Sequence, residues 1–283
     1  DGSGAGTGHD QLQRNSSLTL AGTLTVTQTG SVPYGTYTII SLSSGTISGS
    51  FSTVNLPAEY TLQVNTTTVD LVKAMPVSLN THYFRSITTG DWATPATWES
   101  SPVSDFSSGV VNPATLAPDD NANTITIRNT HNVTINSPVT ADQVVVATGG
   151  TLTQTNNLTL ANGAGDDLTV NGTWNWSSNY LNGPGVVKIG SGGLLNLTTS
   201  NYKYSTTDIT NDGTIDFQDG IFRFEDFKTV INNGTFLLGA TPSFQHGIAG
   251  AGVFTNNGTV TKGTAGNTDL DVTTINNNGT FNF

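Results

Sequence analysis

Apolar residues recur at fixed positions around a glycine motif that repeats through the second half of the chain. Each copy is typically a polar residue, a glycine, a polar residue and an apolar one, as in Asn171-Gly172-Thr173-Trp174. The glycines lie 20 to 24 residues apart. They are Gly150, Gly172, Gly193, Gly213, Gly234, Gly258 and Gly279. A period this regular indicates a solenoid, in which each repeat packs only on its neighbours.

Three positions near each glycine are apolar far more often than composition predicts. Two residues after it stand Leu152, Trp174, Leu195, Ile215, Phe236, Val260 and Phe281. Four residues after it stand Gln154, Trp176, Leu197, Phe217, Leu238, Lys262 and Phe283. Four residues before it stand Val146, Leu168, Ile189, Ile209, Val230, Phe254 and Ile275. Nineteen of these 21 positions are apolar, whereas about seven would follow from the 35% hydrophobic content, so we predict three stacked interior rows.

The spacing of two between apolar positions is that of a strand, with the intervening residue facing solvent. Asn-Gly is expected to supply the positive φ of a tight corner, and stacked Asn or Thr side chains predict hydrogen-bonded ladders outside the core. We therefore predict an all-β, right-handed parallel β-helix with coils of about 21 residues and almost no helix. A leucine-rich repeat has a compatible length but needs a dense leucine consensus that these coils lack.

A related pattern opens the chain. Gly22-Thr23-Leu24 and Gly45-Thr46-Ile47 repeat the corner and strand 23 residues apart. The segment from Leu18 through Ile39 to Pro57 resembles the closing coils of autotransporter-like passenger β-helices. The resemblance covers about residues 1–72 and implies that the chain begins inside a longer β-helix.

A second resemblance follows the stretch around Met75-Pro76. Tyr83-Phe84-Arg85-Ser86, Gly90-Asp91-Trp92, Pro118-Asp119-Asp120-Asn121 and His131-Asn132-Val133 look like openings of large secreted surface proteins of Bacteroidetes-type bacteria. They are also similar to the G8 type of β-helix-leading module. The resemblance implies cell-surface or extracellular placement and supplies no catalytic residue.

Four segments follow from these patterns. We predict terminal β-helix coils at 1–72, a connector at 73–81, an irregular β cap or opening module at 82–143, and regular β-helix repeats at 144–283. Because the chain starts at Asp1 and ends at Phe283 within a repeat, we expect a processed or excised fragment. The last coil then predicts end-to-end self-association or continuation into further coils.

Charge and cysteine content narrow the function classes. The net charge of −11 would repel phosphate backbones and anionic lipid, so nucleic acid and membrane surfaces are poor partners. The absence of cysteine excludes disulfides and thiolate metal sites. No apolar run approaches the ~20 residues of a spanning helix, so we predict no membrane insertion.

Aromatic residues are the candidate ligand contacts. Trp174 and Trp176 align with the apolar rows, which favours burial over sugar stacking. Trp92 and Trp98 precede the first clear repeat, and we weigh a place in the core of the cap against exposed recognition.

Tyr202 and Tyr204 lie at the same offsets from their glycine as Phe222 and Phe224 from the next. We expect all four aromatics inward, with Lys203 and Arg223 outward, because burying those charges is costly. The ligand-binding prediction, if a glycan binds, falls on Trp92, Trp98, Tyr202 and Tyr204.

Catalytic and metal signals are weak. We predict no cofactor, with calcium as the alternative at the acid pairs Asp119-Asp120, Asp166-Asp167, Glu225-Asp226 and Asp269 with Asp271. No metal-binding or nucleophile-elbow motif surrounds His9, His82, His131 or His246. A β-helix polysaccharide lyase or hydrolase is the enzyme alternative, although a fold alone does not establish activity.

We therefore expect a non-enzymatic, extracellular segment of a bacterial cell-surface protein. Its expected role is structural or adhesive, as a stiff rod, stalk or filament unit. A glycan-binding module is the alternative, with surface glycans as partners.

Overall fold

The computed structural model describes residues 10–57, 59–225, 227–246, 252–272 and 274–283. Over these residues it is all strand and turn, apart from one short 3-10 helix, η1 (Pro95–Thr97). The chain divides into two compact units, Asp1–Pro76 and Val77–Phe283, at a point inside the predicted connector. The all-β solenoid predicted from the sequence is confirmed, with stacked coils of about 22 residues and about seven turns.

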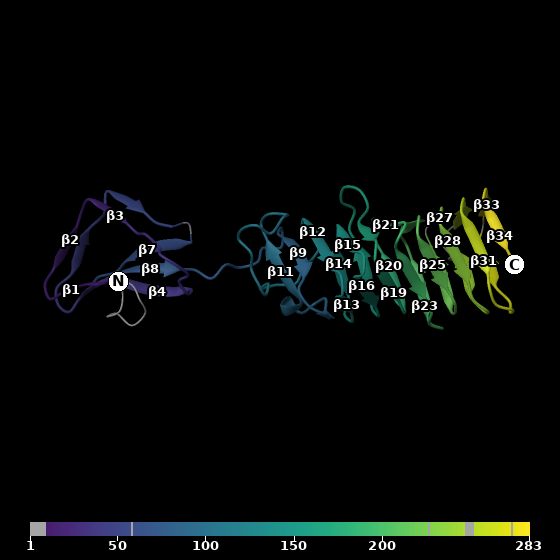
Figure 1. Cartoon of the computed structure of the whole chain (residues 1–283), viewed down its shortest axis with the longest axis horizontal. Coiled ribbons are helices and arrows are strands. Elements are labelled where there is room, and N and C mark those ends of the chain that lie inside the picture. Colours follow the sequence, from purple (N-terminus) through teal and green to yellow (C-terminus); the bar gives the residue numbers. More distant parts are fainter. Residues whose placement is uncertain (1–9, 58, 226, 247–251, 273) are drawn as a thin grey trace. The chain divides into compact units, whose positions relative to one another are not determined.

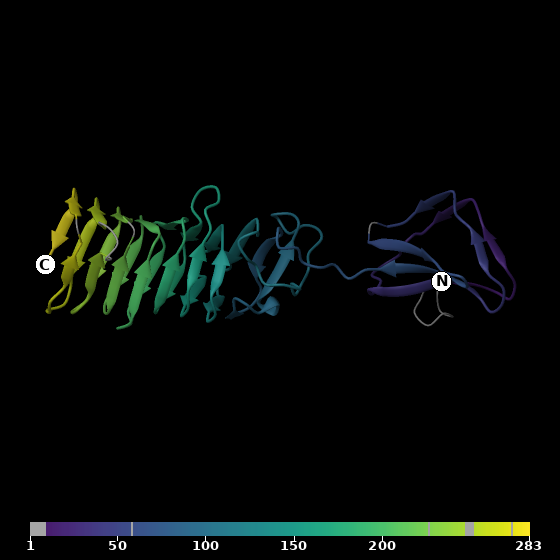
Figure 2. The same ribbon diagram turned by 180° about the vertical axis from the view of Figure 1, so that it is seen from behind.

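The second unit is built from three sheets whose strands stack along one direction (Figures 1 and 2). The nine-stranded sheet contains β10 (Gly90–Asp91), β13 (Asn132–Ile135), β16 (Thr151–Gln154), β19 (Thr173–Trp176), β22 (Leu194–Leu197), β25 (Thr214–Phe217), β28 (Thr235–Leu238), β31 (Thr259–Lys262) and β34 (Thr280–Asn282). The ten-stranded sheet contains β11 (Trp98–Ser101), β9 (Tyr83–Ser86), β12 (Thr124–Ile127), β15 (Val144–Val146), β18 (Leu168–Val170), β21 (Val186–Ile189), β24 (Asp208–Asn211), β27 (Thr229–Asn232), β30 (Val253–Asn256) and β33 (Thr274–Asn277). The seven-stranded sheet contains β14 (Val139–Ala141), β17 (Leu158–Leu160), β20 (Asn179–Asn182), β23 (Tyr202–Ser205), β26 (Ile221–Phe224), β29 (Ser243–His246) and β32 (Asp269–Asp271).

Each coil contributes one strand to each sheet, and the chain visits the sheets in the same order every turn. The regular coils begin with β12, one coil earlier than the predicted boundary at residue 144. The sequence motif misses this coil because His131 stands where the next coil has the motif glycine Gly150, one residue before the pair Asn132 and Thr151. Before it, β9 pairs with β12 in parallel and with β11 antiparallel, which closes this end of the ten-stranded sheet.

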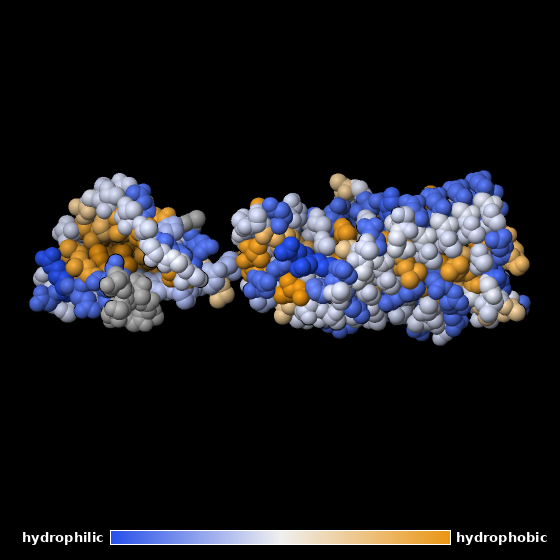
Figure 3. Space-filling model, viewed as in Figure 1, coloured by the Kyte–Doolittle hydropathy of each residue, from blue (hydrophilic) through white to orange (hydrophobic). Residues whose placement is uncertain are grey.

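Side chains alternate between a buried and a half-buried face along almost every regular strand, as the spacing of two predicts. The row that starts at Leu152 is buried as far as Val260, and the row that starts at Gln154 is buried as far as Leu238. The outer positions carry mostly Thr, Asn and Asp, so the visible face of this unit is largely blue and white in Figure 3.

The third predicted row points inward but is two rows, not one. Val146 pairs with Val170 and then Ile189, whereas Leu168 pairs with Val144. The reason is corner length: four residues separate β15 from β16 and β21 from β22, whereas only two separate β18 from β19. In the coils with a four-residue corner, counting back four residues from the glycine therefore reaches the other inward row of the preceding strand.

The row that contains Ile189 continues as asparagine inside the solenoid. Asn211, Asn232 and Asn256 are fully buried, and their side-chain amides bond from coil to coil. Asn211 Nδ2 donates to Asn232 Oδ1 at 2.7 Å, and Asn232 Nδ2 donates to Asn256 Oδ1 at 2.8 Å. The sequence predicts such ladders only outside the core, where a second one runs from Asp212 through Asn233. A buried amide is tolerated here because the neighbouring coil satisfies it.

The motif glycine of each corner is needed because the backbones of successive coils approach closely there. It is not needed to adopt the positive φ that the sequence predicts. Gly172, Gly234 and Gly258 do not have φ in the left-handed range. A Cβ on Gly258 would lie 2.1 Å from the carbonyl oxygen of Gly234 in the preceding coil. At the spacing that the strand ladders impose, this corner therefore has room only for glycine.

Two polar residues interrupt the row that starts at Gln154, and both donate to corner carbonyls. Gln154 Nε2 donates to the carbonyls of Asn156 and Tyr180 at 3.0 Å each. Lys262 Nζ donates to the carbonyl of Gly239 at 2.6 Å. Asn156 and Gly239 lie in corners where the chain leaves the nine-stranded sheet, whereas Tyr180 lies on β20 of the seven-stranded sheet, and these donors satisfy their backbone oxygens.

The first unit has fewer turns and a longer, less regular repeat. Its strands are β1 (Leu12–Arg14), β2 (Leu18–Leu20), β3 (Thr23–Thr25), β4 (Gly35–Leu42), β5 (Ile47–Gly49), β6 (Thr53–Asn55), β7 (Tyr60–Val64) and β8 (Thr68–Lys73). Parallel pairs β1/β4, β2/β5 and β3/β6 join its two turns, and β8 then pairs antiparallel with both β4 and β7. Leu18 pairs with Ile47, so the repeat is 29 residues here and not the predicted 23. The long segment 26–34 accounts for the difference.

We expect the inner asparagine ladder to contribute more stability than the outer one. Asn232→Ala leaves Asn211 without one acceptor and Asn256 without its donor in a water-free interior, at a cost of about 2–3 kcal/mol. Asn233→Ala, one residue on and exposed, is the matched control and costs less than about 1 kcal/mol. Denaturant unfolding of both variants measures the difference, and equal losses would contradict a structural role for the buried amides.

Candidate functional site

The main cluster of exposed aromatic side chains in the second unit lies on the outer face of the seven-stranded sheet. Tyr180 on β20 stacks on Tyr204 on β23, with ring centroids 4.6 Å apart and planes 14° from parallel. Tyr202 stacks on Tyr204 from the same strand at 5.6 Å. The guanidinium of Arg223, in the next coil, lies 5.8 Å from the Tyr204 ring centroid. We call these four residues the tyrosine strip.

Exposure differs along the strip. Tyr180 is 41% exposed and Tyr202 is 48% exposed, whereas Tyr204 is held between its neighbours. Burial, together with the nearby Tyr180 hydroxyl, raises the pKa of Tyr204 above its ordinary value. The two outer rings therefore present the surface that a ligand can reach, and Tyr204 anchors them.

The strip contradicts the predicted orientation of β23. Tyr202 and Tyr204 face outward and Lys203 faces the core with no exposed surface, whereas Phe222 and Phe224 face inward and Arg223 outward as predicted. Lys203 pairs with Phe222 in the ladder, not with Arg223. Four residues, 198–201, form the corner before β23, but three, 218–220, form the corner before β26. The extra residue shifts β23 by one position relative to the motif glycine, so its inward and outward residues are the opposite of those predicted.

Lys203 lies in the core, and its ammonium group donates hydrogen bonds to carbonyls of the corner before β23. Its Nζ donates to the carbonyls of Thr199, at 2.5 Å, and Asn201, at 2.9 Å. Burial lowers the pKa of Lys203 to about 8, and the carboxylate of Asp219 opposes that shift. The ammonium group therefore has hydrogen-bond partners, but removing its charged form from water still costs free energy.

The two tryptophans of the cap cannot serve as a sugar platform. Trp92 is 2% exposed and Trp98 is fully buried, with ring centroids 5.1 Å apart in an edge-on contact. Trp92 Nε1 donates to the carbonyl of Pro118 at 3.0 Å, and Trp98 Nε1 donates to the carbonyl of Trp92 at 2.8 Å. Their predicted ligand-binding role is corrected by this burial, and the alternative place in the core of the cap holds. Trp174 and Trp176 are buried as predicted, and their planes lie 2° apart.

The cap also contains a buried carboxylate, Glu99, that the sequence patterns did not predict. Glu99 on β11 is 5% exposed, and its Oε1 accepts from Arg85 Nε at 2.5 Å. Arg128 Nη1 lies 3.5 Å from the same oxygen, and Asn112 Nδ2 donates to Oε2 at 2.9 Å. With both oxygens occupied by cap residues, Glu99 joins β9, β11 and the first coil. The antiparallel pairing that brings Arg85 opposite Glu99 is a tertiary feature without a local motif.

Two histidines contact serines in the cap. His131 Nδ1 lies 2.8 Å from Ser86 Oγ, and His82 Nδ1 lies 3.3 Å from Ser100 Oγ. Ser86 is fully buried, and its hydroxyl also accepts from the backbone N–H of Arg128. Burial lowers the pKa of His82. The serine–histidine geometry therefore orders the cap and leaves no reachable nucleophile in either pair. His9 and the side chain of His246 lie outside the described residues.

The acid pairs considered for calcium have separate surroundings. Asp167 is fully buried and accepts from the backbone N–H groups of Gly163 and Val186 at 2.9 and 2.7 Å. Asp166 beside it is exposed. Asp226 lies outside the described residues. Within the part of the chain that the structure describes, no three His, Cys, Asp or Glu side chains come together as a metal site.

The remaining two acid pairs also lie in turns or on an edge. Asp119 Oδ1 accepts from the backbone N–H of Asn121 at 2.9 Å, which is the hydrogen bond of a local turn. Asp269 accepts from Ser243 at 3.3 Å, and Asp271 is exposed on the same strand. Asn121 Nδ2 also donates to Asp119 Oδ1 and Asp120 Oδ1, at 3.1 and 3.3 Å.

Lys203 predicts a specific pH dependence of stability. Between about pH 8 and its ordinary pKa of 10.5, the unfolded chain binds a proton at Lys203 that the folded protein has released. The free energy of unfolding therefore rises with pH across this window. Lys203→Met removes this contribution, so urea titrations between about pH 7 and pH 10 are expected to show a smaller rise for the variant. Identical pH profiles would contradict the burial of an ionisable ammonium.

Comparison with known proteins identifies no relative. No protein-family model matches the chain, and no curated protein or solved structure matches it.

Proposed function

We propose that this chain is a structural or adhesive segment of a secreted bacterial cell-surface protein, acting as a stiff rod, stalk or filament unit. The observation that carries the proposal is the uninterrupted stacking of coils in the second unit. From β12 onward, each of the three sheets continues through parallel pairs without a break in register order.

Stiffness follows from the direction of these bonds. In a parallel β-helix the backbone hydrogen bonds run along the axis, so bending the rod stretches them on one side. The inner and outer asparagine ladders add side-chain bonds in the same direction, as in the 2.9 Å bond from Asn257 to Asn233. A core that runs unbroken from Ile125 to Val260 removes any seam at which the rod would hinge.

Extracellular placement is supported by composition and by the resemblances described above. The chain is rich in Thr, Asn and Ser and has only 9 Lys and Arg, so its surface has few positive charges to attract nucleic acid or anionic membranes. Among the described residues, no helix is long and apolar enough to cross a membrane. We propose a non-enzymatic role, because the serine–histidine pairs and Glu99 hold the cap together, and Asp167 accepts from backbone N–H groups within the coils.

The last coil offers a surface that another strand-bearing end would complement. Ile275 is 42% exposed and Phe283 is 81% exposed, and Phe281 is partly buried. A further coil, or the end of a second copy, would extend the rows of apolar and asparagine side chains. End-to-end association is therefore the self-interaction that we propose, and light scattering of the chain at increasing concentration measures it.

Paired spin labels test the rod directly, because the chain has no cysteine of its own. Thr134→Cys and Thr261→Cys place labels on outer positions of β13 and β31, six ladder steps apart. A stiff solenoid places the labelled backbones about 29 Å apart, since each step is ~4.8 Å, with a narrow distribution. Pulsed electron spin resonance measures it, and a broad distribution would exclude a rigid rod.

Labelling of intact cells tests the location. Antibodies to the folded chain are expected to bind intact cells of the source bacterium, and added protease is expected to remove the signal. A signal that appears only after permeabilisation would refute surface placement. An antibody to a cytoplasmic protein serves as the control for cell integrity.

A further inference from the structure

We propose that the tyrosine strip is a binding surface for a neutral polysaccharide that lies along the flank of the solenoid. The proposal goes beyond the rod: a rod that binds no glycan would remain a rod. It rests on how the strip is oriented, on what its side chains offer and on the local charge.

The orientation of the strip is maintained at a cost. One coil further on, the inward position that pairs with Lys203 holds Phe222, which is the cheaper solution, and the outward position that pairs with Tyr204 holds Arg223. β23 instead buries Lys203 between the outward-facing Tyr202 and Tyr204. Departures from local rules that lower stability are expected where a surface serves a function.

The coil before it also departs from a local rule. Asn179 has a φ of 73° immediately before Tyr180, a left-handed conformation that few residues with a Cβ adopt, Asn among them. Asn179 pairs with Lys203 in the adjacent coil, and the next pair of the ladder, Tyr180 and Tyr204, forms one stack. Two independent irregularities thus converge on the same exposed aromatic surface.

The side chains offer the contacts that a sugar needs. Tyrosine combines a rigid apolar ring, on which the C–H face of a pyranose packs, with a hydroxyl that bonds to sugar hydroxyls. Arg223 adds a guanidinium whose Nη2 donates to Gln245 Oε1 at 3.2 Å; Nη1 is the donor left for a ligand among the described contacts, because Nε is buried. Tyr180 and Tyr202, each more than 40% exposed, provide two ring contacts in neighbouring coils.

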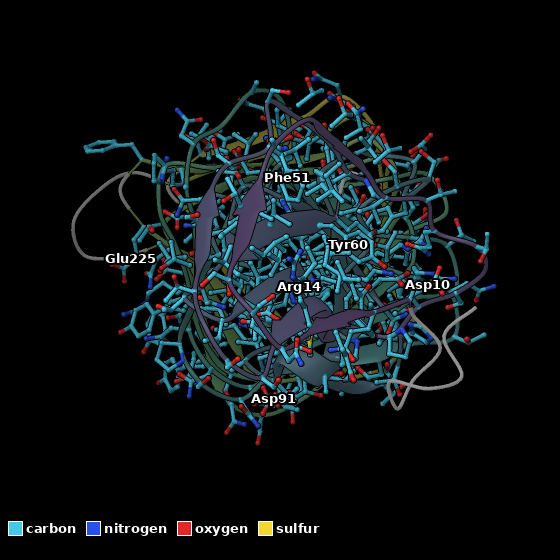
Figure 4. The ribbon with its side chains drawn as sticks, turned by 90° about the vertical axis from the view of Figure 1, so that its left-hand side faces the viewer. Asp10, Arg14, Phe51, Tyr60, Asp91 and Glu225 are labelled. Carbon is cyan, nitrogen blue, oxygen red and sulfur yellow. The ribbon has the colours of Figure 1, made fainter. Side chains whose placement is uncertain are left out.

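Charge favours a neutral ligand over an acidic one. Glu225 follows β26 and lies at the rim of the projection in Figure 4, and its charge contributes to the raised pKa of Tyr204. It offsets the positive charge of Arg223 beside the strip. The net charge of −11 over the whole chain adds a field that repels polyanions.

Native gel electrophoresis in gels that contain a polysaccharide tests the proposal. The probes are galactomannan, hydroxyethylcellulose and pullulan as neutral polymers, and polygalacturonate as the acidic one. At least one neutral polymer is expected to retard the natural chain. The double variant Tyr180→Ser/Tyr202→Ser is expected to bind about tenfold more weakly, because two ring contacts are lost.

The matched control is Tyr34→Ser in the first unit, because Tyr34 is 47% exposed and lies outside the strip. Its retardation is expected to equal that of the natural chain. Circular dichroism and thermal unfolding check that each variant folds. If the double variant does not fold, Tyr202→Ser alone carries the test, since that ring is the most exposed of the strip, with an expected loss of about threefold.

Three outcomes would overturn the proposal. No retardation of the natural chain by any neutral polymer would leave the stacked tyrosines with a purely structural role. Equal retardation of the natural chain and the strip variants would place binding elsewhere. Retardation by polygalacturonate alone would show that the surface selects acidic glycans.

Discussion

The close stacking of backbone on backbone at the glycine corner is the constraint on which the solenoid depends. Gly234 and Gly258 approach so closely that a Cβ on the upper residue would lie 2.1 Å from the lower carbonyl. The parallel ladders hold the coils at an axial spacing of ~4.8 Å, at which this corner has no room for a Cβ, and that spacing decides what can stack beside it. Backbone N–H groups of Asn257 and Gly258 both donate to the carbonyl of Asn232 below, so the corner itself carries hydrogen bonds from coil to coil.

A fixed axial spacing favours the same polar side chain at the same position of successive coils. The donor of one copy then lies within reach of the acceptor of the next without rearrangement. Asn232 satisfies this condition inside the core and Asn233 satisfies it outside, in adjacent positions of one corner. Inward polar residues elsewhere satisfy their groups differently. Lys203 and Lys262 reach corner carbonyls within the coils instead of a copy of themselves. Both solutions keep buried polar groups paired, which is the condition for placing them in a core.

Sequence periodicity predicted the inward rows because one rule, a spacing of two beside a repeated corner, holds through most coils. It failed where corner length changed. The four-residue corners at 147–150 and 190–193 moved Val146 and Ile189 into the asparagine row, and one extra residue before β23 turned Tyr202 outward. The cap lay beyond this reasoning, since the pairing of Arg85 with Glu99 arises from an antiparallel contact. Half of the predicted ligand-binding residues, Trp92 and Trp98, were therefore misplaced.

Corner length also explains how the residues of one strand can shift relative to the motif glycine while the neighbouring strands keep their register. The corner before β23 is one residue longer than the corner before β26, but the corner after β23, residues 206–207, is two shorter than residues 225–228. The later shortening returns Ile209 to its place opposite Val230. The shift is therefore confined to one strand, and its main cost is the buried Lys203. A solenoid of this kind can present Tyr202 on its flank without disturbing the rows that hold the coils together, because those rows are set at the other two sheets.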